Sequence, residues 1–244
     1  TSMTVEDATD KATCRERVWD ELEASGVARF PFPPHGRIPN FAGADAAADR
    51  LADTDAWADA DAVKANPDAP QLPVRRAALR AGKRLYMAVP RLRDERPFYE
   101  LDPAAIPPAE YDRAPTVSHV ESYARQVAPE DLPGIDLVVS GSVAVTESGV
   151  RVGKGEGYSD IEWAVLAGFD RVGPSTTVAT TVHERQIVDG VEPAPHDVPI
   201  DLVVTPERRV ETGAAAARPD GIDWGLLGDR IEEMPVLERL RNGR

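Results

Sequence analysis

The chain has 244 residues, enough to bury a substantial core in one large α/β domain or two small ones. Its net charge of −14 excludes non-specific affinity for nucleic acid or anionic lipid, because both need a basic surface. Cys14 is the only cysteine, so no disulfide can form within the chain.

The composition also bears on the compartment. No apolar run approaches the ~18 residues of a membrane helix, and the N-terminus lacks the apolar core of a signal peptide. We therefore expect a cytoplasmic protein without membrane or nucleic-acid partners. Acidic residues dominate and lysine is scarce, which predicts adaptation to high salt. The lysines are Lys11, Lys64, Lys83 and Lys154.

The N-terminal part begins with a polar stretch. We expect residues 1–10 to be disordered and residues 11–244 to form a single α/β domain. Val18 and Leu22 recur at helical spacing, and Ser25-Gly26 is a stop signal, so a helix is predicted over Lys11–Ala24. Lys11 and Arg15 share one face of this helix. By themselves they are either a solvated pair or a contact for an anion.

The next part alternates helices, strands and proline-rich segments. Phe30–Phe41 has too many prolines for a helix or central strand and is too apolar for a linker, so it is predicted to wrap across the domain. Asp102–Pro115 is a second wrapping segment. Helices are predicted over Ala44–Ala52 and Gln71–Ala81, and strands over Ala60–Ala65 and Lys83–Val89.

Three later stretches are continuous apolar runs. Ile135–Ser140, Thr176–Val182 and Ile200–Thr205 are typical of strands covered on both faces. The sequence therefore predicts a three-layer α/β/α fold with a mainly parallel sheet, followed by a helical segment over Asp223–Leu240. Ligands of such folds bind at the C-terminal ends of the strands. This rule brings Pro90–Arg93, Ser140–Ser142, His183 and Thr205 toward one edge.

The stretch Arg151–Glu162 is the strongest candidate for a site. Its glycines alternate, so the backbone can approach a ligand closely and direct successive amides at one anion. Basic side chains and a tyrosine accompany them, Asp160 offers an oxygen suited to Mg²⁺, and the following apolar residues predict a helix. Spaced glycines also occur in ordinary turns, and the spacing matches neither the Walker-A loop nor the dinucleotide fingerprint.

From about Lys11 to Glu207 the sequence resembles the 5-formyltetrahydrofolate cyclo-ligase (methenyltetrahydrofolate synthetase) family, and most closely its methenyltetrahydrofolate synthetase domain-containing branch. The branch motifs are Arg37-Ile38-Pro39-Asn40-Phe41, Val63-Lys64 with Asn66-Pro67-Asp68, and Pro90-Arg91-Leu92-Arg93. The family core is the glycine loop from Arg151 together with His196-Asp197. The resemblance implies a fold of the NagB/CoA-transferase-like type.

The resemblance also implies an activity, which is the ATP- and Mg²⁺-dependent cyclisation of 5-formyltetrahydrofolate to 5,10-methenyltetrahydrofolate through a phosphorylated formyl intermediate. The implied catalytic residues are Arg151, Lys154 and Tyr158, and the implied metal ligands are Asp160 and Asp197. The implied ATP-binding residues are Lys11, Arg15, Arg151, Gly153, Lys154, Gly155, Glu156, Gly157, Tyr158 and Ser159. The implied substrate-binding residues are Asp68, Lys154, Gly155, Gly157, Tyr158 and Gln186.

Several positions keep alternatives open. Asp68 is either a contact for the pterin or a cap for the following helix. Ser159 stands where the family usually has tyrosine, and Val145-Thr146 stands where it has Phe-Asp, which reduces the stacking surface for a flat ring. A second hypothesis is therefore a non-folate substrate, such as a thiamine-related compound, and a third is a non-catalytic binding protein. We expect a monomer or weak dimer.

Overall fold

The computed structural model describes residues 10–214 and 217–243. Its centre is a sheet of eight strands in the order β12-β11-β10-β7-β3-β4-β5-β6. The five strands from β11 to β4 are parallel, and the pairings outside them, β11 with β12, β4 with β5 and β5 with β6, are antiparallel. The parallel strands are β3 (Ala62–Ala65), β4 (Arg84–Ala88), β7 (Leu137–Ser140), β10 (Thr177–Thr181) and β11 (Leu202–Val204). The antiparallel strands near the two edges of the sheet are β5 (Phe98–Leu101), β6 (Arg125–Val127) and β12 (Arg209–Glu211).

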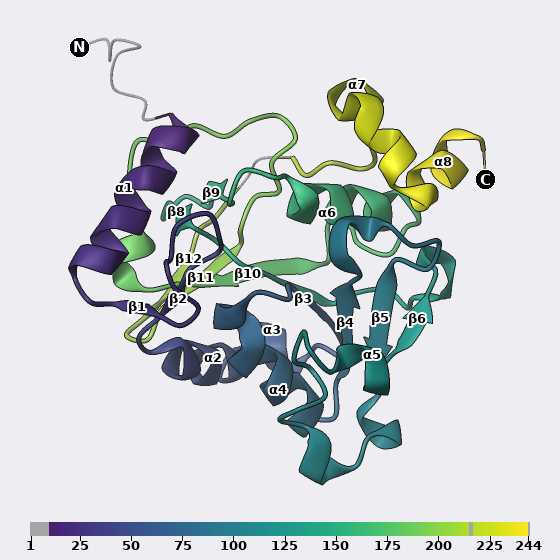
Figure 1. Ribbon diagram of the computed structural model, residues 1–244, viewed down its shortest axis with the longest axis horizontal. Helices are drawn as coiled ribbons and strands as arrows, with labels where there is room; N and C mark the ends of the chain where they lie inside the picture. The colour runs from purple at the N-terminus through teal and green to yellow at the C-terminus, as the bar shows by residue number, and fades with distance from the viewer. Residues whose placement is uncertain (1–9, 215–216, 244) are drawn as a thin grey trace.

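Helices cover both faces of this sheet (Figure 1). Because side chains alternate along a strand, Leu137 and Val139 of β7 face one layer and Val138 faces the other. The first layer contains α2 (Ala44–Ala52), α3 (Asp55–Ala58) and α4 (Leu72–Arg80). The second contains α6 (Tyr158–Gly168), α7 (Trp224–Leu227) and α8 (Pro235–Arg241). The predicted three-layer α/β fold is thus confirmed.

Helix α1 (Lys11–Ala24) lies to one side of these layers. Its buried face, with Cys14, Val18 and Leu22, packs on Val143 and Val152 beside a small antiparallel sheet. That sheet pairs β8 (Ala144–Val145) with β9 (Arg151–Val152). A second small sheet pairs β1 (Ala28–Arg29) with β2 (Asn40–Phe41) at the two ends of the first proline-rich segment. The packing of α1 places its first turn next to the segment that follows β9.

The remaining helices are short. They are α5 (Val120–Tyr123) and the 3-10 turns η1 (Ala69–Gln71), η2 (Pro90–Leu92), η3 (Pro103–Ala105), η4 (Pro108–Glu110), η5 (Pro129–Asp131), η6 (Glu184–Gln186) and η7 (Gly228–Glu233). None of the helices in the described part of the chain is long and apolar enough to cross a membrane.

Most predicted elements are present within a few residues of their expected bounds. The predictions missed the antiparallel edge strands, which are short and lack a continuous apolar run. The C-terminal segment is helical as predicted but consists of α7, η7 and α8, with a break before Pro235. The predicted disorder falls on residues 1–9, outside the described residues. Asp10 was assigned to that tail, but it caps α1 by accepting a hydrogen bond from the Thr13 amide.

Candidate active site

The glycine-rich turn connects β9 to α6, as the sequence predicted. Gly155 (φ 108°) and Gly157 (φ 74°) adopt the left-handed region, which other L-residues enter only with strain. Gly157 is the N-cap of α6 and has no side chain with which to bond the first amides of the helix. Such amides, together with the helix dipole, favour a negatively charged ligand.

A cavity of about 430 Å³ lies beside this turn, at the C-terminal ends of β3 and β4. It collects almost every residue that the sequence predicted for the site. The predicted residues that line it are Lys11, Arg15, Asp68, Arg151, Gly153, Lys154, Gly155, Glu156, Gly157, Tyr158, Ser159, Asp160 and Asp197. Pro90 and Arg91 also line it, in agreement with the rule for strand ends.

Basic side chains hold the turn from two sides. Arg15 donates from Nε to the Gly153 carbonyl at 2.6 Å, and its guanidinium lies 3.5 Å from the place that a Cβ on Gly155 would occupy. Arg151 donates from Nε to the Gly141 carbonyl at 2.7 Å. These bonds use only part of each guanidinium, so further N–H groups remain for a ligand. The solvated-pair interpretation of Arg15 is wrong, because its side chain reaches across to the turn.

The two predicted metal ligands, Asp160 and Asp197, both line the cavity. Lys11 Nζ lies 2.5 Å from Oδ2 of Asp197, which also accepts a hydrogen bond from the Ala194 amide at 2.7 Å. In the part of the chain that the structure describes, the one charged partner near Oδ1 of Asp197 is the ring of His196, with its Nε2 at 3.8 Å. Burial raises the pKa of Asp160, with the Asp197 charge adding to the rise and Arg151 opposing it.

This pair of carboxylates fits a hard divalent cation. Mg²⁺ is usually held by one or two carboxylates together with phosphate oxygens and water, and Asp160 and Asp197 provide such a donor set. Among the described residues, Glu16, Asp20 and His35 are the only group of three spaced closely enough to hold an ion by themselves. They lie on α1 and the loop after it, outside the cavity, and His35 already bonds Asp20.

Asp68 lines the cavity and does not cap its own helix. It occupies the N-cap position of η1, but its side chain makes no capping hydrogen bond, so the capping interpretation is wrong. Burial raises the pKa of this carboxyl, and Lys154, Arg75, Arg151 and Lys64 oppose the rise. Among the described residues no group donates a hydrogen bond to the carboxylate, which is therefore available in the cavity.

A buried ion pair beneath the cavity was missed by the sequence predictions. Lys64 Nζ lies 3.0 Å from Glu162 Oε2 and 3.2 Å from Asn66 Oδ1, and the two charged side chains are only 2% and 7% exposed. Glu162 and Asn66 line the cavity. The clue in the sequence was a lysine inside a continuous apolar strand, where a charge needs a partner.

Three other residues lie away from the cavity. Gln186 is fully buried, donates to the carbonyls of Ser142 and Val143, and accepts from the His183 amide, so its geometry does not support the predicted substrate contact. His183 is the N-cap of η6, and its side chain accepts a hydrogen bond from the Arg185 amide. Val145 is fully buried in the core, so only Ser159 of the two substituted aromatic positions faces the cavity.

The fold and this cavity define a class of protein. It is a three-layer α/β protein in which a basic, glycine-rich turn faces paired carboxylates at the C-terminal ends of parallel strands. The family follows from comparison with known proteins. Residues 9–206 match the model of the 5-formyltetrahydrofolate cyclo-ligase family, and the chain belongs to that family, as its motifs predicted.

Known relatives agree with this membership, and a solved structure agrees with the fold. The chain is 40% identical over 245 residues to the methenyltetrahydrofolate synthase domain-containing protein of Mus musculus, covering 98% of the chain and 65% of that protein. It is 38% identical to the Homo sapiens protein of the same name, covering 95% and 61%. The chain thus spans less than two thirds of these relatives. The NMR structure of Aquifex aeolicus 5,10-methenyltetrahydrofolate synthetase has a similar fold, with a TM-score of 0.53, 16% identity and coverage of 85% and 95%.

Proposed function

We propose that this protein catalyses the ATP-dependent cyclisation of 5-formyltetrahydrofolate to 5,10-methenyltetrahydrofolate. The observation that carries the proposal is the convergence of Lys11, Arg15 and Lys154 on one glycine-rich turn that faces Asp160 and Asp197. Family membership supports the reaction. Both substrates are anionic, and the basic side chains that line the cavity attract them locally in a protein whose net charge of −14 otherwise repels them.

The nucleotide phosphates bind at the turn in this proposal. Amides of Gly155 to Tyr158 point toward the oxygens, and the left-handed glycines leave the backbone free of side chains that would hold the phosphate away. Arg15, Arg151 and Lys154 offset the charge that spreads over the transferred group. Phosphoryl transfer depends mainly on positioning and on such charge stabilisation, so the turn and its cations supply most of the catalysis.

The proposed reaction consists of two successive displacements. The formyl oxygen of the substrate attacks the γ-phosphorus of ATP, the bond from that phosphorus to the bridging oxygen breaks, and ADP leaves. N10 of the substrate then attacks the activated formyl carbon and loses its proton. The carbon–oxygen bond breaks, inorganic phosphate leaves, and the five-membered ring of the methenyl product is closed.

The chain's own residues orient these steps. Asp68 accepts hydrogen bonds from the pterin at the end of β3, and Tyr158 lies between nucleotide and substrate at the first turn of α6. Asp160 and Asp197 hold Mg²⁺, which when bound neutralises charge on the phosphate oxygens. Lys11 holds Asp197 in place and offsets part of its charge in the free enzyme.

The test is direct. Purified protein with ATP, Mg²⁺ and 5-formyltetrahydrofolate should form a product with the near-ultraviolet absorbance of the methenyl compound. Lys154→Met and Asp197→Asn should each lower kcat/KM by at least tenfold, the amount expected for one charged contact to a transferred phosphate. Intact ATP binding without product from wild-type protein would refute the folate assignment.

A second candidate is a related ligase that binds ATP but acts on a non-folate compound, such as a thiamine-related one. The observation in its favour is Ser159, which lines the cavity where the family usually has a tyrosine ring. ATP hydrolysis stimulated by such a compound and not by 5-formyltetrahydrofolate would support it. The third candidate is a non-catalytic binding protein. Metal-dependent nucleotide affinity that is unchanged in Asp160→Ala would support it.

A further inference from the structure

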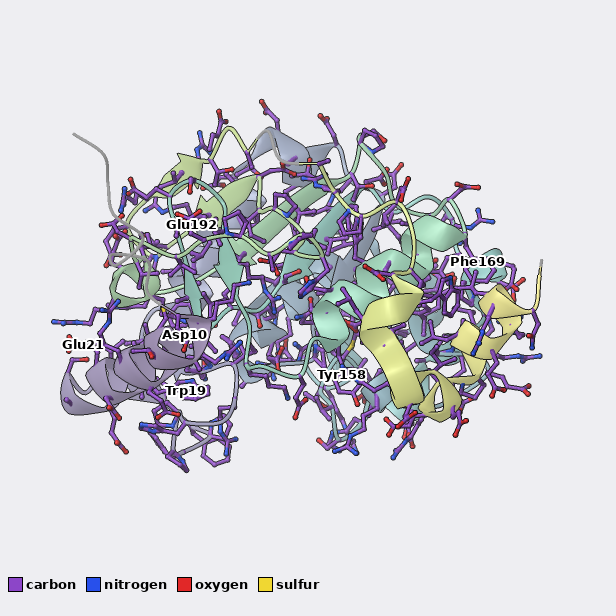
Figure 2. All side chains as sticks on the ribbon, turned by 90° about the horizontal axis from the view of Figure 1, so that it is seen from above. Asp10, Trp19, Glu21, Tyr158, Phe169 and Glu192 are labelled. Atoms are coloured by element: carbon purple, nitrogen blue, oxygen red, sulfur yellow. The ribbon has the colours of Figure 1, made fainter. Side chains whose placement is uncertain are left out.

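The C-terminal segment reaches the active site from outside the matched family region. The family model ends at residue 206, whereas residues 217–243 pack along α6 and reach its first turn (Figure 1). Figure 2 shows Tyr158 at the end of α6 that lies beside this segment. The Arg230 guanidinium carbon lies 4.7 Å from the centre of the Tyr158 ring, and its NH1 lies 3.8 Å from the place of a Cβ on Gly157.

A second arginine shows how the segment is anchored. Arg218 lies over the ring of Trp163, with its guanidinium carbon 5.4 Å from the ring centre, and it is ion-paired with Asp201. Its NH1 also donates to the Thr176 carbonyl at 2.6 Å. Trp163 in turn donates from its indole nitrogen to the Pro219 carbonyl at 2.8 Å. The guanidinium of Arg218 is therefore committed to protein partners and fixes the segment on α6.

Arg230 differs from Arg218 in what it bonds. Among the described residues no carboxylate lies within ion-pair distance of Arg230. Its guanidinium lies over the ring of Tyr158 instead. A guanidinium carries five N–H donors, so stacking on a ring leaves its edge free for an oxyanion. The residue is half-buried and held by the packing of α7 and η7, so little conformational entropy is lost when it binds.

Arg230 also lines a second compartment of about 800 Å³. This compartment shares Gly157, Asp160 and His196 with the first cavity, and Ile222 and Trp224 form part of its apolar wall. Asp160, Asp220 and Asp223 also line it and repel an anion, so the place in this compartment that favours an anionic group is beside Arg230 and the first amides of α6, at Gly157.

We propose that Arg230 is a ligand-binding residue of this active site and contacts an oxyanion of the reacting molecules across the Gly157 turn. This inference rests on the proposed function for its substrates. The oxyanion is either a phosphate of the nucleotide or a carboxylate of the folate's glutamyl tail. Each of these groups presents two oxygens that can accept hydrogen bonds from one guanidinium. In either case the C-terminal segment completes a site that the matched family region leaves open on this side.

The experiment compares Arg230→Gln, Arg230→Lys and the matched control Arg218→Gln in the full chain. Calorimetry gives the affinity for ATP and for adenosine, and initial rates give KM for 5-formyltetrahydrofolate and for the same compound with a longer glutamate tail. Arg230→Gln should weaken binding about tenfold, as expected for one charge-assisted contact, and Arg230→Lys should recover part of the loss. Arg218→Gln should lower the melting temperature but change each affinity by less than about twofold.

The pattern of losses identifies the oxyanion. A loss for ATP but not for adenosine assigns a phosphate, and a loss that grows with the length of the glutamate tail assigns a carboxylate. A contact to a charged ligand also predicts a shallower dependence of log Kd on log salt in Arg230→Gln, which a purely structural role would not produce. Unchanged affinity for every ligand would overturn the proposal. Weakened ATP binding in Arg230→Gln, with no methenyl product from wild-type protein, would keep Arg230 in the site and reject the folate reaction.

Discussion

The buried pair of Lys64 and Glu162 makes a sharp prediction about stability. Removal of one member of a buried ion pair leaves the other charge without compensation, which costs about 3–5 kcal/mol. Lys64 keeps a second acceptor, Asn66 Oδ1 at 3.2 Å, whereas Glu162 has no other recorded partner among the described residues. Lys64→Met should therefore lower the free energy of unfolding by an amount in the upper part of that range, and Glu162→Gln should lower it by less.

Denaturant unfolding measures these costs. The double variant Lys64→Met with Glu162→Gln should recover most of the loss, since no buried charge remains unpaired. The matched control is Arg80→Met, which breaks the exposed pair with Asp112 and should change the free energy of unfolding by less than about 1 kcal/mol. Single variants at the buried pair that lose as little as the control would refute the reasoning.

Further predictions follow from the site and the composition. Gly155→Ala should lower ATP affinity and cost about 1–2 kcal/mol of stability, because its φ of 108° strains any side chain; an unchanged melting temperature would show that the turn relaxes freely. Burial raises the pKa of Asp68 above its ordinary value of 3.8, so the carboxyl ionises less readily in the folded chain than in the unfolded chain. The wild-type protein therefore loses stability as the pH rises from 3.8 through the raised pKa of the folded state. Asp68→Asn should therefore melt higher than wild type at pH 7 and equally at pH 3, and the opposite order would reverse the assigned sign. The charge of −14 predicts that molar KCl raises the melting temperature, and a temperature indifferent to salt would contradict adaptation to high salt.

The long periodic elements were predictable because local pattern determines them. Helices α1 and α2 have the bounds that spacing and stop signals indicated, and the central strands follow their apolar runs. The edge strands were not predictable in the same way. These strands, β5, β6 and β12, are only three or four residues long, so their pairing depends on the neighbouring strand rather than on their own composition.

The features of the site likewise fall into those that local sequence predicts and those that depend on tertiary packing. The sequence by itself determined the glycine turn, the acid at Asp160 and the family, because residue type and spacing within one segment carry that information. Only the tertiary structure decided three contacts. Lys11 pairs with Asp197, the Gln186 amide donates its hydrogen bonds to backbone carbonyls, and the Arg230 guanidinium lies over the Tyr158 ring. These contacts join residues far apart in the chain, and their geometry depends on how whole layers pack, which local spacing does not encode.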